Sequence, residues 1–283
     1  MLCIIPLLCR RGTGDIIMCG IKYFISQSSA SLLYLFGLIV STKLEGFLIL
    51  SVLAIVFKLG LPPFHRWLLS MIFKISYYEL FLILTLQKVI PLIILSQIGL
   101  SFWLLILMIT RGGLYLFVRI NSNCSIRYIL FLSSVRNGGF IMRSVLVGSW
   151  AAFLAGYSII LVPAVILLSQ VKSSKLRDLR FGPLLILVGL AVQFFNLGGV
   201  PPLIGFRVKL IVLKSLTSLR LGLILVLLLT SFLVLYIYLT LFFQVYCVYL
   251  DHDTVGGVEN HPRGVALSFA MLLTLRGMGW FMV

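Results

Sequence analysis

The feature that most constrains this chain is a series of apolar stretches, each long enough to cross a bilayer, separated only by short polar breaks. A helix rises about 1.5 Å per residue, so it needs about 20 mostly apolar residues to cross a hydrocarbon core of about 30 Å. We predict nine full spans, at residues 21–41, 46–66, 77–98, 100–118, 125–147, 149–171, 183–216, 221–249 and 264–283. The expected fold is an all-α, polytopic transmembrane helix bundle of about nine to ten helices, two of them broken.

Composition excludes a water-soluble domain. Apolar residues make up 61% of the 283 residues and charged residues 11%, whereas soluble domains have about 45–50% and about 25%. Because so few charges cannot cover a water-exposed surface, most of the surface must face lipid. We treat residues 1–283 as a single transmembrane domain, in which residues 1–20 are the remnant of a shortened N-terminal helix with a basic loop and residues 251–263 are a polar loop.

The net charge of +16 arises from 23 Lys and Arg against 7 Asp and Glu. In a soluble chain this balance would indicate nucleic-acid binding, but here the basic residues stand singly between or within apolar spans, and no nucleic-acid motif is present. Most basic residues outside the spans or near their ends fall on one predicted side, and only Lys43, Arg143 and Arg220 fall on the other. This asymmetry is typical of positive-inside topology, so the expected partner is the lipid bilayer and not nucleic acid.

Three lysines stand inside apolar spans beside residues that interrupt helices. Lys58 begins the segment KLGLPP, Lys88 precedes a proline in QKVIP, and Lys209 ends GGVPPLIGFRVK. A basic residue at the centre of a membrane helix costs about 2.5–3.5 kcal/mol, and broken helices free backbone groups that can line a hydrated cavity. Because an amine can be charged or neutral, the three lysines are candidates for a proton relay. The alternative is that Gly and Pro are simply frequent in membrane helices.

Two further residues bear on proton movement. His65 lies at the end of a span and can titrate near neutral pH, so it is a candidate for proton uptake or release at one membrane face. An interfacial hydrogen-bonding role fits His65 equally well. Arg136 lies inside the 125–147 span, and because arginine keeps its proton we expect it to act as a fixed charge and not as a carrier.

Several segments carry a family signature. The segments at 58–67 (KLGLPPFHRW) and 84–91 (LTLQKVIP) resemble the family segments KLGxAPFHFW and LTWQKLAP. Those at 196–209 (NLGGVPPLIGFRVK) and 21–31 (IKYFISQSSAS) resemble SLGGLPPLTGFLPK and IKYFLTQATAS. The segment at 111–135 (RGGLYLFVRINSNCSIRYILFLSSV) follows a WGGL and LRKILAYSSI pattern. These are segments of the antiporter-like, proton-translocating subunits of mitochondrial respiratory complex I (NADH:ubiquinone oxidoreductase), most of them of its subunit 2 type. The chain therefore resembles that family.

The resemblance implies an antiporter-like fold and a core subunit of the membrane arm of complex I, multi-pass in the mitochondrial inner membrane. It implies that Lys58, Lys88 and Lys209 form a hydrated relay, coupled to electron transfer from NADH to ubiquinone. It also implies that this chain holds no redox centre or cofactor, and that FMN, the iron–sulfur clusters and ubiquinone bind to other subunits. Other membrane-arm subunits are the implied partners. The five scattered cysteines give no metal-ligand spacing, so we expect no metal site.

Three features depart from the family pattern. A family glutamate that pairs with the first lysine would fall just before Met1, so we expect either a separate polypeptide to supply missing N-terminal helices or an altered pump. Arg136-Asn137 stands where the family often has histidine, and Ser70 stands at an acidic position. Two alternatives therefore remain open: a structural membrane-arm subunit with impaired proton passage, and a stand-alone cation/proton antiporter subunit.

Overall fold

The computed structural model describes residues 14–43, 48–99, 102–119, 125–171, 184–201, 203–214 and 221–252. Within these ranges the regular structure is α-helical, without strands. The helices are α2 (Gly14–Ser41), α3 (Leu48–Leu59), α4 (Arg66–Ile72), α5 (Tyr77–Leu84), α6 (Leu86–Ile98), α7 (Phe102–Arg119), α8 (Ile126–Val147), α9 (Trp150–Val171), α10 (Leu184–Gly198), α11 (Ile204–Lys214) and α12 (Leu221–His252).

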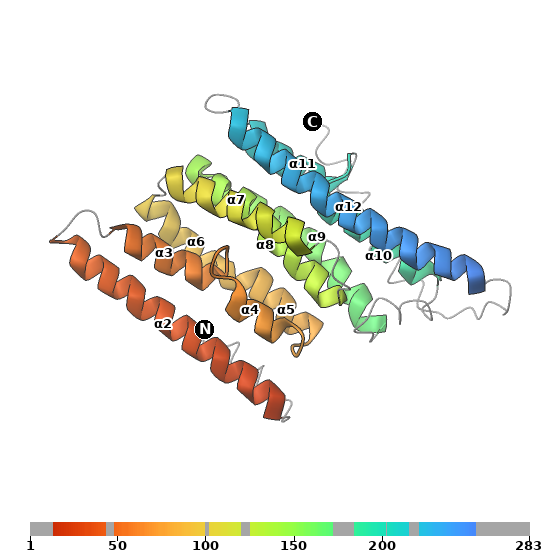
Figure 1. Cartoon of the computed structure of the whole chain (residues 1–283), viewed down its shortest axis with the longest axis horizontal. Helices are drawn as coiled ribbons and strands as arrows, with labels where there is room; N and C mark the ends of the chain where they lie inside the picture. The colour runs from red at the N-terminus through yellow and green to blue at the C-terminus, as the bar shows by residue number, and fades with distance from the viewer. Residues whose placement is uncertain are drawn as a thin grey trace.

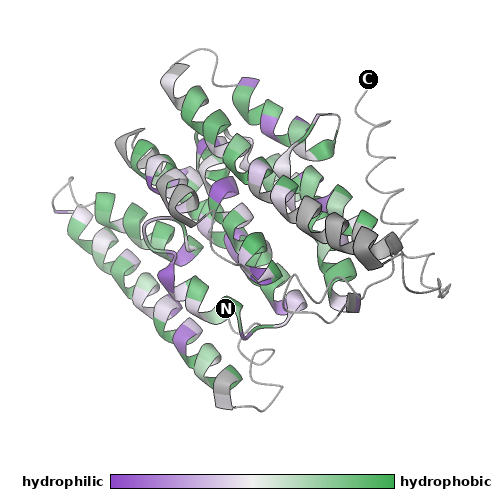
Figure 2. Ribbon diagram, turned by 45° about the vertical axis from the view of Figure 1, so that its right-hand side comes forward, coloured by the Kyte–Doolittle hydropathy of each residue, from purple (hydrophilic) through white to green (hydrophobic). Residues whose placement is uncertain are grey.

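Several of these helices have the length and hydropathy of membrane spans. In the described part of the chain, three stretches are long and apolar enough to cross a bilayer: Ile16–Ser41, Tyr77–Ile98 and Trp150–Gln170. Shorter apolar helices cover Leu48–Leu59, Val188–Gly198 and Leu225–Thr240. Figure 2 shows that most of the ribbon is green (hydrophobic), and that purple, hydrophilic residues interrupt it near the middle of the bundle. The predicted all-α transmembrane bundle is confirmed.

Glycines make two of the helix interruptions. Between α3 and α4 the backbone turns at Gly60, and between α10 and α11 it turns at Gly199. Their φ angles are 66° and 82°, in the left-handed region that glycine adopts without steric cost. The sequence segments KLGLPP and GGVPP predicted interruptions at these two places.

A third interruption lies at Thr85, between α5 and α6, close to residue 87, where Pro91 is expected to leave a carbonyl unpaired and to kink the helix. Pro91 lies inside α6. A proline ring crowds the preceding helical turn, and here the helix is interrupted at Thr85, whose hydroxyl donates to Phe81 O at 2.7 Å. The Lys88 N–H then bonds to Thr85 O at 3.0 Å, three residues back instead of four. The irregular backbone therefore lies one turn before Lys88.

Helix α8 is the axis of the bundle. In Figure 1 it lies between α2 at one edge and α12 toward the opposite side. It contacts α4, α5, α6, α7, α9, α11 and α12, and nearly all its side chains between Ile126 and Val145 are buried. Because lipid provides no hydrophobic drive between helices, close packing of this kind holds the bundle together. The polar stretch SSVRN (133–137) stands in the middle of α8 and brings hydrogen-bonding groups to the centre.

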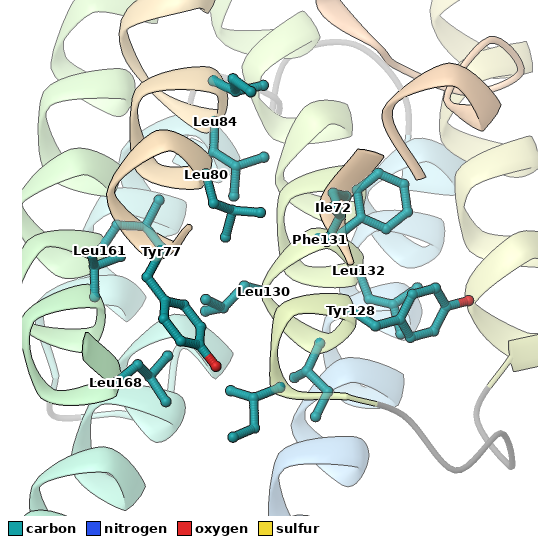
Figure 3. Close-up of a cluster of buried hydrophobic side chains, with 14 of the residues drawn as sticks. Ile72, Tyr77, Leu80, Leu84, Tyr128, Leu130, Phe131, Leu132, Leu161 and Leu168 are labelled. Carbon is teal, nitrogen blue, oxygen red and sulfur yellow. The ribbon is translucent and has the colours of Figure 1, made fainter. Parts of the chain in front are cut away.

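Two clusters of buried hydrophobic side chains lie on either side of that polar stretch. Before it, Leu130 and Phe131 of α8 pack with residues of α4, α5 and α9, such as Ile72, Leu80 and Leu161, as Figure 3 shows. After it, α8 packs with α3, α6 and α11 in a second cluster. The completely buried members of this cluster are Val56, Leu92, Leu95, Phe140, Met142 and Val212. The polar residues of α8 are therefore enclosed between two apolar layers.

The boundary of the first described helix, α2, differs from the predicted span at its N-terminal end. Helix α2 begins at Gly14 and not at residue 21, so residues 14–20 form its first turns. Hydropathy locates the apolar part of a helix but not its less apolar ends. The span predicted at 264–283 and residues 253–263 of the predicted polar loop lie outside the described residues, while residues 251–252 end α12.

Candidate functional site

Lys88 lies in the interior of the bundle on α6, with 3% of its surface exposed. Its Nζ donates a hydrogen bond to Ser134 Oγ on α8 at 2.8 Å and lies 5.8 Å from the centre of the Tyr157 ring on α9. A hydroxyl and an aromatic ring face are weaker partners for an ammonium group than a carboxylate. Because burying a charge without a strong partner is costly, this environment suits a lysine that can give up its proton.

Lys209 lies on α11, across the helix interruption from the end of α10. Its Nζ donates to Leu197 O at 3.1 Å and to Gly198 O. The last carbonyls of a helix have no partners within that helix and carry about half a negative charge together. Gly199 provides the space, because a Cβ there would collide with the lysine side chain. The interruption between α10 and α11 therefore creates the binding place for the Lys209 ammonium.

Arg136 of α8 binds the same two carbonyls. Its Nη2 donates to Leu197 O at 2.7 Å and to Asn137 Oδ1 at 2.8 Å, and its Nη1 donates to Gly198 O at 3.4 Å. Arg136 is 3% exposed. Two cations from two helices thus share one helix end, and the fixed charge predicted at Arg136 lies directly beside Lys209.

Lys58 lies in the last turn of α3 and is half-buried. Its carbonyl oxygen accepts a hydrogen bond from Gln27 Nε2 of α2 at 3.3 Å. Among the described residues, none accepts a hydrogen bond from its Nζ. Helix α3 packs against α6, so Lys58 lies on a neighbour of the helix that carries Lys88, and no hydrogen bond between described residues joins it to the Lys88–Ser134 pair.

His65 lies in the interruption between α3 and α4 and is 7% exposed. Its ring centre lies 4.1 Å from that of Tyr115 on α7 and 6.0 Å from that of Phe131 on α8. Its Nδ1 is buried without a hydrogen-bond partner among the described residues. The structure therefore encloses the imidazole among aromatic side chains next to α8.

Neutral groups, and not carboxylates, hold these cations. In the described ranges no Asp or Glu pairs with Lys88, Arg136 or Lys209. Glu79 closes a capping box at the start of α5, where its Oε2 accepts from the Ser76 N–H at 2.9 Å. The same ranges contain no group of three or more His, Cys, Asp or Glu side chains that could hold a metal ion.

Sequence reasoning did not assign a role to four side chains that complete the site, although it named Asn137 as a departure from the family pattern. Ser134 and Asn137 had a signal, because a polar run in an apolar helix is unusual. Asn196 had a weaker one in the NLGG segment, and its Oδ1 accepts the Gly205 N–H at 2.7 Å across the interruption. Tyr157 had none, because its place beside Lys88 follows from how α9 packs on α8.

Comparisons with curated proteins show similarity along the whole chain. No protein-family model matches it. It is 28% identical to "NADH-ubiquinone oxidoreductase chain 2" of Branchiostoma lanceolatum, over 100% of this chain and 87% of that protein. The protein of the same name from Locusta migratoria is 24% identical over 98% of this chain and 86% of that protein, and the one from Ailuropoda melanoleuca is 29% identical over 77% and 68%. The resemblance inferred from the sequence segments is confirmed.

Solved structures share the fold. A chain of respiratory complex I from Thermus thermophilus, determined with bound aureothin, superimposes with a TM-score of 0.80 at 20% identity, over 99% of this chain and 71% of that chain. A chain of the membrane-bound sulfane sulfur reductase, an archaeal respiratory membrane complex, superimposes with a TM-score of 0.78 at 14% identity, over 99% and 66%. The chain therefore has the predicted antiporter-like fold.

Proposed function

We propose that the chain is a core membrane-arm subunit of respiratory complex I, of the subunit 2 type, with a proton pathway through Lys58, Lys88 and Lys209 that is coupled to electron transfer from NADH to ubiquinone. It would act as one subunit of an H⁺-translocating NADH:ubiquinone reductase in the mitochondrial inner membrane, with FMN, iron–sulfur clusters and ubiquinone in other subunits. The similarity to proteins named NADH-ubiquinone oxidoreductase chain 2 and the shared fold support this proposal.

The polar centre of α8 is the observation that carries the proposal. Lys88 binds Ser134, while Arg136 shares the end of α10 with Lys209, so both buried lysines meet the same short stretch of α8. Hydroxyls, amides and carbonyls surround them between two apolar clusters. A confined polar path inside a dry bundle is the arrangement in which protons can pass without a general ion leak.

The shared helix end gives Lys209 a charge state that responds to its surroundings. When Lys209 is protonated, two cations occupy the Leu197 and Gly198 carbonyls. When Lys209 is neutral, Arg136 keeps those carbonyls alone, and the repulsion between the two side chains disappears. A change of charge elsewhere in the bundle can therefore bias the uptake or release of one proton, as a pathway driven by a distant reaction requires.

The substitution Lys88→Met tests the relay. Methionine is apolar and of similar length, so we expect the protein to assemble and to sustain electron transfer while fewer protons are translocated per electron. The measurement is the proton-to-electron ratio of the intact complex in sealed vesicles. The matched control is Lys43→Met, which makes the same change at an exposed position after α2. An unchanged ratio in Lys88→Met would refute the relay.

Arg136 favours a second candidate, a structural membrane-arm subunit with impaired proton passage. Its guanidinium keeps its charge and lies between Ser134, the partner of Lys88, and the helix end that holds Lys209. A permanent cation at this point would oppose the passage of a proton. The structural candidate predicts equal proton-to-electron ratios in Lys88→Met and in the unsubstituted protein, so the same measurement separates the two functions.

A further inference from the structure

Arg207 is a charge on a membrane helix that has no partner in the described part of the chain. It lies on α11, two residues closer to the interruption at Gly199 than Lys209. Its Nη1 is buried, and none of the described residues forms a hydrogen bond or an ion pair with it. A guanidinium keeps its proton, and an unpaired charge inside a membrane is costly. Arg207 therefore needs a partner from elsewhere.

The geometry of α11 directs Arg207 away from the interior of the bundle. Successive residues of an α-helix are about 100° apart, so the buried residues of α11 lie on the side opposite Arg207. These are Gly205, Lys209 and Val212. The side of α11 that carries Arg207 also carries Ile211, which is 47% exposed, and Lys214, which is exposed as well. We call Arg207, Ile211 and Lys214 the outer face of α11.

A lipid headgroup does not fit as the partner of Arg207. Lys214 ends α11, and it lies about 10 Å along the helix from Arg207 at 1.5 Å per residue. Long basic side chains reach the headgroups when they lie near the end of a helix. The side chains of an α-helix lean toward its N-terminus, so Arg207 leans toward the interruption and away from the Lys214 end. Its partner therefore lies at the depth of the hydrocarbon.

The sequence offers no carboxylate at that depth. The nine predicted spans contain a single acidic residue, Glu79. Glu79 lies in the first turn of α5, where its carboxylate closes the capping box with Ser76. The other acidic residues of the chain fall outside the predicted spans. A second copy of the chain would have the same shortage, so a carboxylate for Arg207 has to come from a different polypeptide.

We propose that the outer face of α11 is an interface with a transmembrane helix of another polypeptide, and that an Asp or Glu on this helix pairs with Arg207. A carboxylate offsets the charge of the guanidinium and can accept two parallel hydrogen bonds from it. Ile211, one turn further along α11, packs against the same helix. This inference rests on the proposed membership of a multi-subunit membrane assembly, but not on the proton pathway.

A photoreactive residue at Ile211 identifies the neighbour. The assembly that contains Ile211→benzoylphenylalanine is purified and irradiated, and the cross-linked peptide is sequenced by mass spectrometry. We expect a peptide from a transmembrane helix of another polypeptide, with an Asp or Glu within about two turns of the linked residue. The control is Ile90→benzoylphenylalanine, at a 64% exposed position on α6, which should not label that peptide. Cross-links to lipid alone, to a helix without an acidic residue, or to a second copy of the chain would overturn the inference.

The substitution Arg207→Leu tests the ion pair itself. It leaves the partner's carboxylate buried and unpaired, so the fraction of the chain that stays with the assembly in detergent should fall by about tenfold or more. Replacing the acidic residue of the cross-linked peptide by leucine as well should restore that fraction. If Arg207 faced lipid, Arg207→Leu would only remove an unpaired charge. An unchanged or larger fraction in Arg207→Leu would therefore contradict the pair.

Failure of the interface can be distinguished from failure of the proposed function. A chain that migrates with a large NADH-oxidising assembly, but cross-links only to lipid at Ile211, refutes the interface and leaves the proposed function in place. A chain that migrates alone in native electrophoresis refutes both.

Discussion

The two buried lysines of this bundle are held by neutral hydrogen-bond acceptors. Lys88 has a hydroxyl, and Lys209 has two carbonyls that it shares with Arg136. Neutral acceptors bind an ammonium group less strongly than a carboxylate does, so the free energies of the charged and neutral forms lie closer together. The proposed relay, in which each lysine gains and loses a proton in every cycle, requires such a balance.

Ser134 is the residue on which Lys88 depends most directly. The substitution Ser134→Ala removes the hydroxyl that accepts from Lys88 Nζ and leaves the apolar packing of α8 in place. A hydrogen bond to a charged group contributes about 1.5–3 kcal/mol, so we expect proton translocation through this subunit to slow by about tenfold or more. The rate of acidification by the complex in sealed vesicles, at saturating NADH, measures this effect.

Ser144→Ala is the control for that substitution. Ser144 lies on the same helix, is completely buried, and donates its hydroxyl hydrogen to Ile141 O at 2.7 Å. Its replacement deletes the same atoms away from the lysines, so proton translocation should not change. If both substitutions slowed translocation equally, the effect of Ser134→Ala would come from general damage to α8 and not from its bond to Lys88.

At the scale of helices, the contact between α10 and α11 depends on one missing side chain. Gly205 lies so close to Asn196 that a Cβ would collide with the Asn196 backbone oxygen. We predict that Gly205→Ala forces the two helices apart and destabilises the protein by about 1–3 kcal/mol, the usual cost of overpacking. The midpoint of thermal unfolding in detergent should fall accordingly.

Gly222→Ala is the matched comparison, because a Cβ at Gly222 on α12 meets nothing within 4 Å. Alanine favours a helix more than glycine does, by about 1 kcal/mol, so this substitution should leave the midpoint unchanged or raise it slightly. A midpoint for Gly205→Ala as high as that for Gly222→Ala would show that α10 and α11 do not pack as closely as described.

Hydropathy could predict the helices of this chain, because nearly every residue of a membrane span has to be apolar. The interruption before Lys88 could be predicted from Pro91 only to within a turn, since a proline disturbs the turn before it and local hydrogen bonds decide that the helix is broken at Thr85. Lys88 and Lys209 stood out as buried charges in apolar sequence. The partner of Lys88 did not, because Ser134 is 46 residues from Lys88, and spacing alone does not show which helix faces meet.

At the scale of the whole molecule, the proposed function makes a prediction about size. Membranes containing the protein are solubilised in a mild detergent and separated by native electrophoresis, with an antibody to this chain. We expect the chain to migrate with an assembly many times its own 31.7 kDa that also reduces ubiquinone analogues with NADH. A band of tens of kilodaltons, active in cation/proton exchange, would support the stand-alone antiporter and contradict the complex I assignment.

The bonds of Arg136 to the end of α10 have a consequence for how the protein is made. Helices of this kind enter the membrane in order as the ribosome synthesises them, so α8 reaches the translocon before the Leu197 and Gly198 carbonyls exist. Of the hydrogen bonds that Arg136 makes in the described structure, only the one to Asn137 can form before α10 follows, and a charge so poorly matched resists release into lipid. Nascent chains that stop short of residue 198 should therefore remain attached to the insertion machinery, and those that include α10 should leave it.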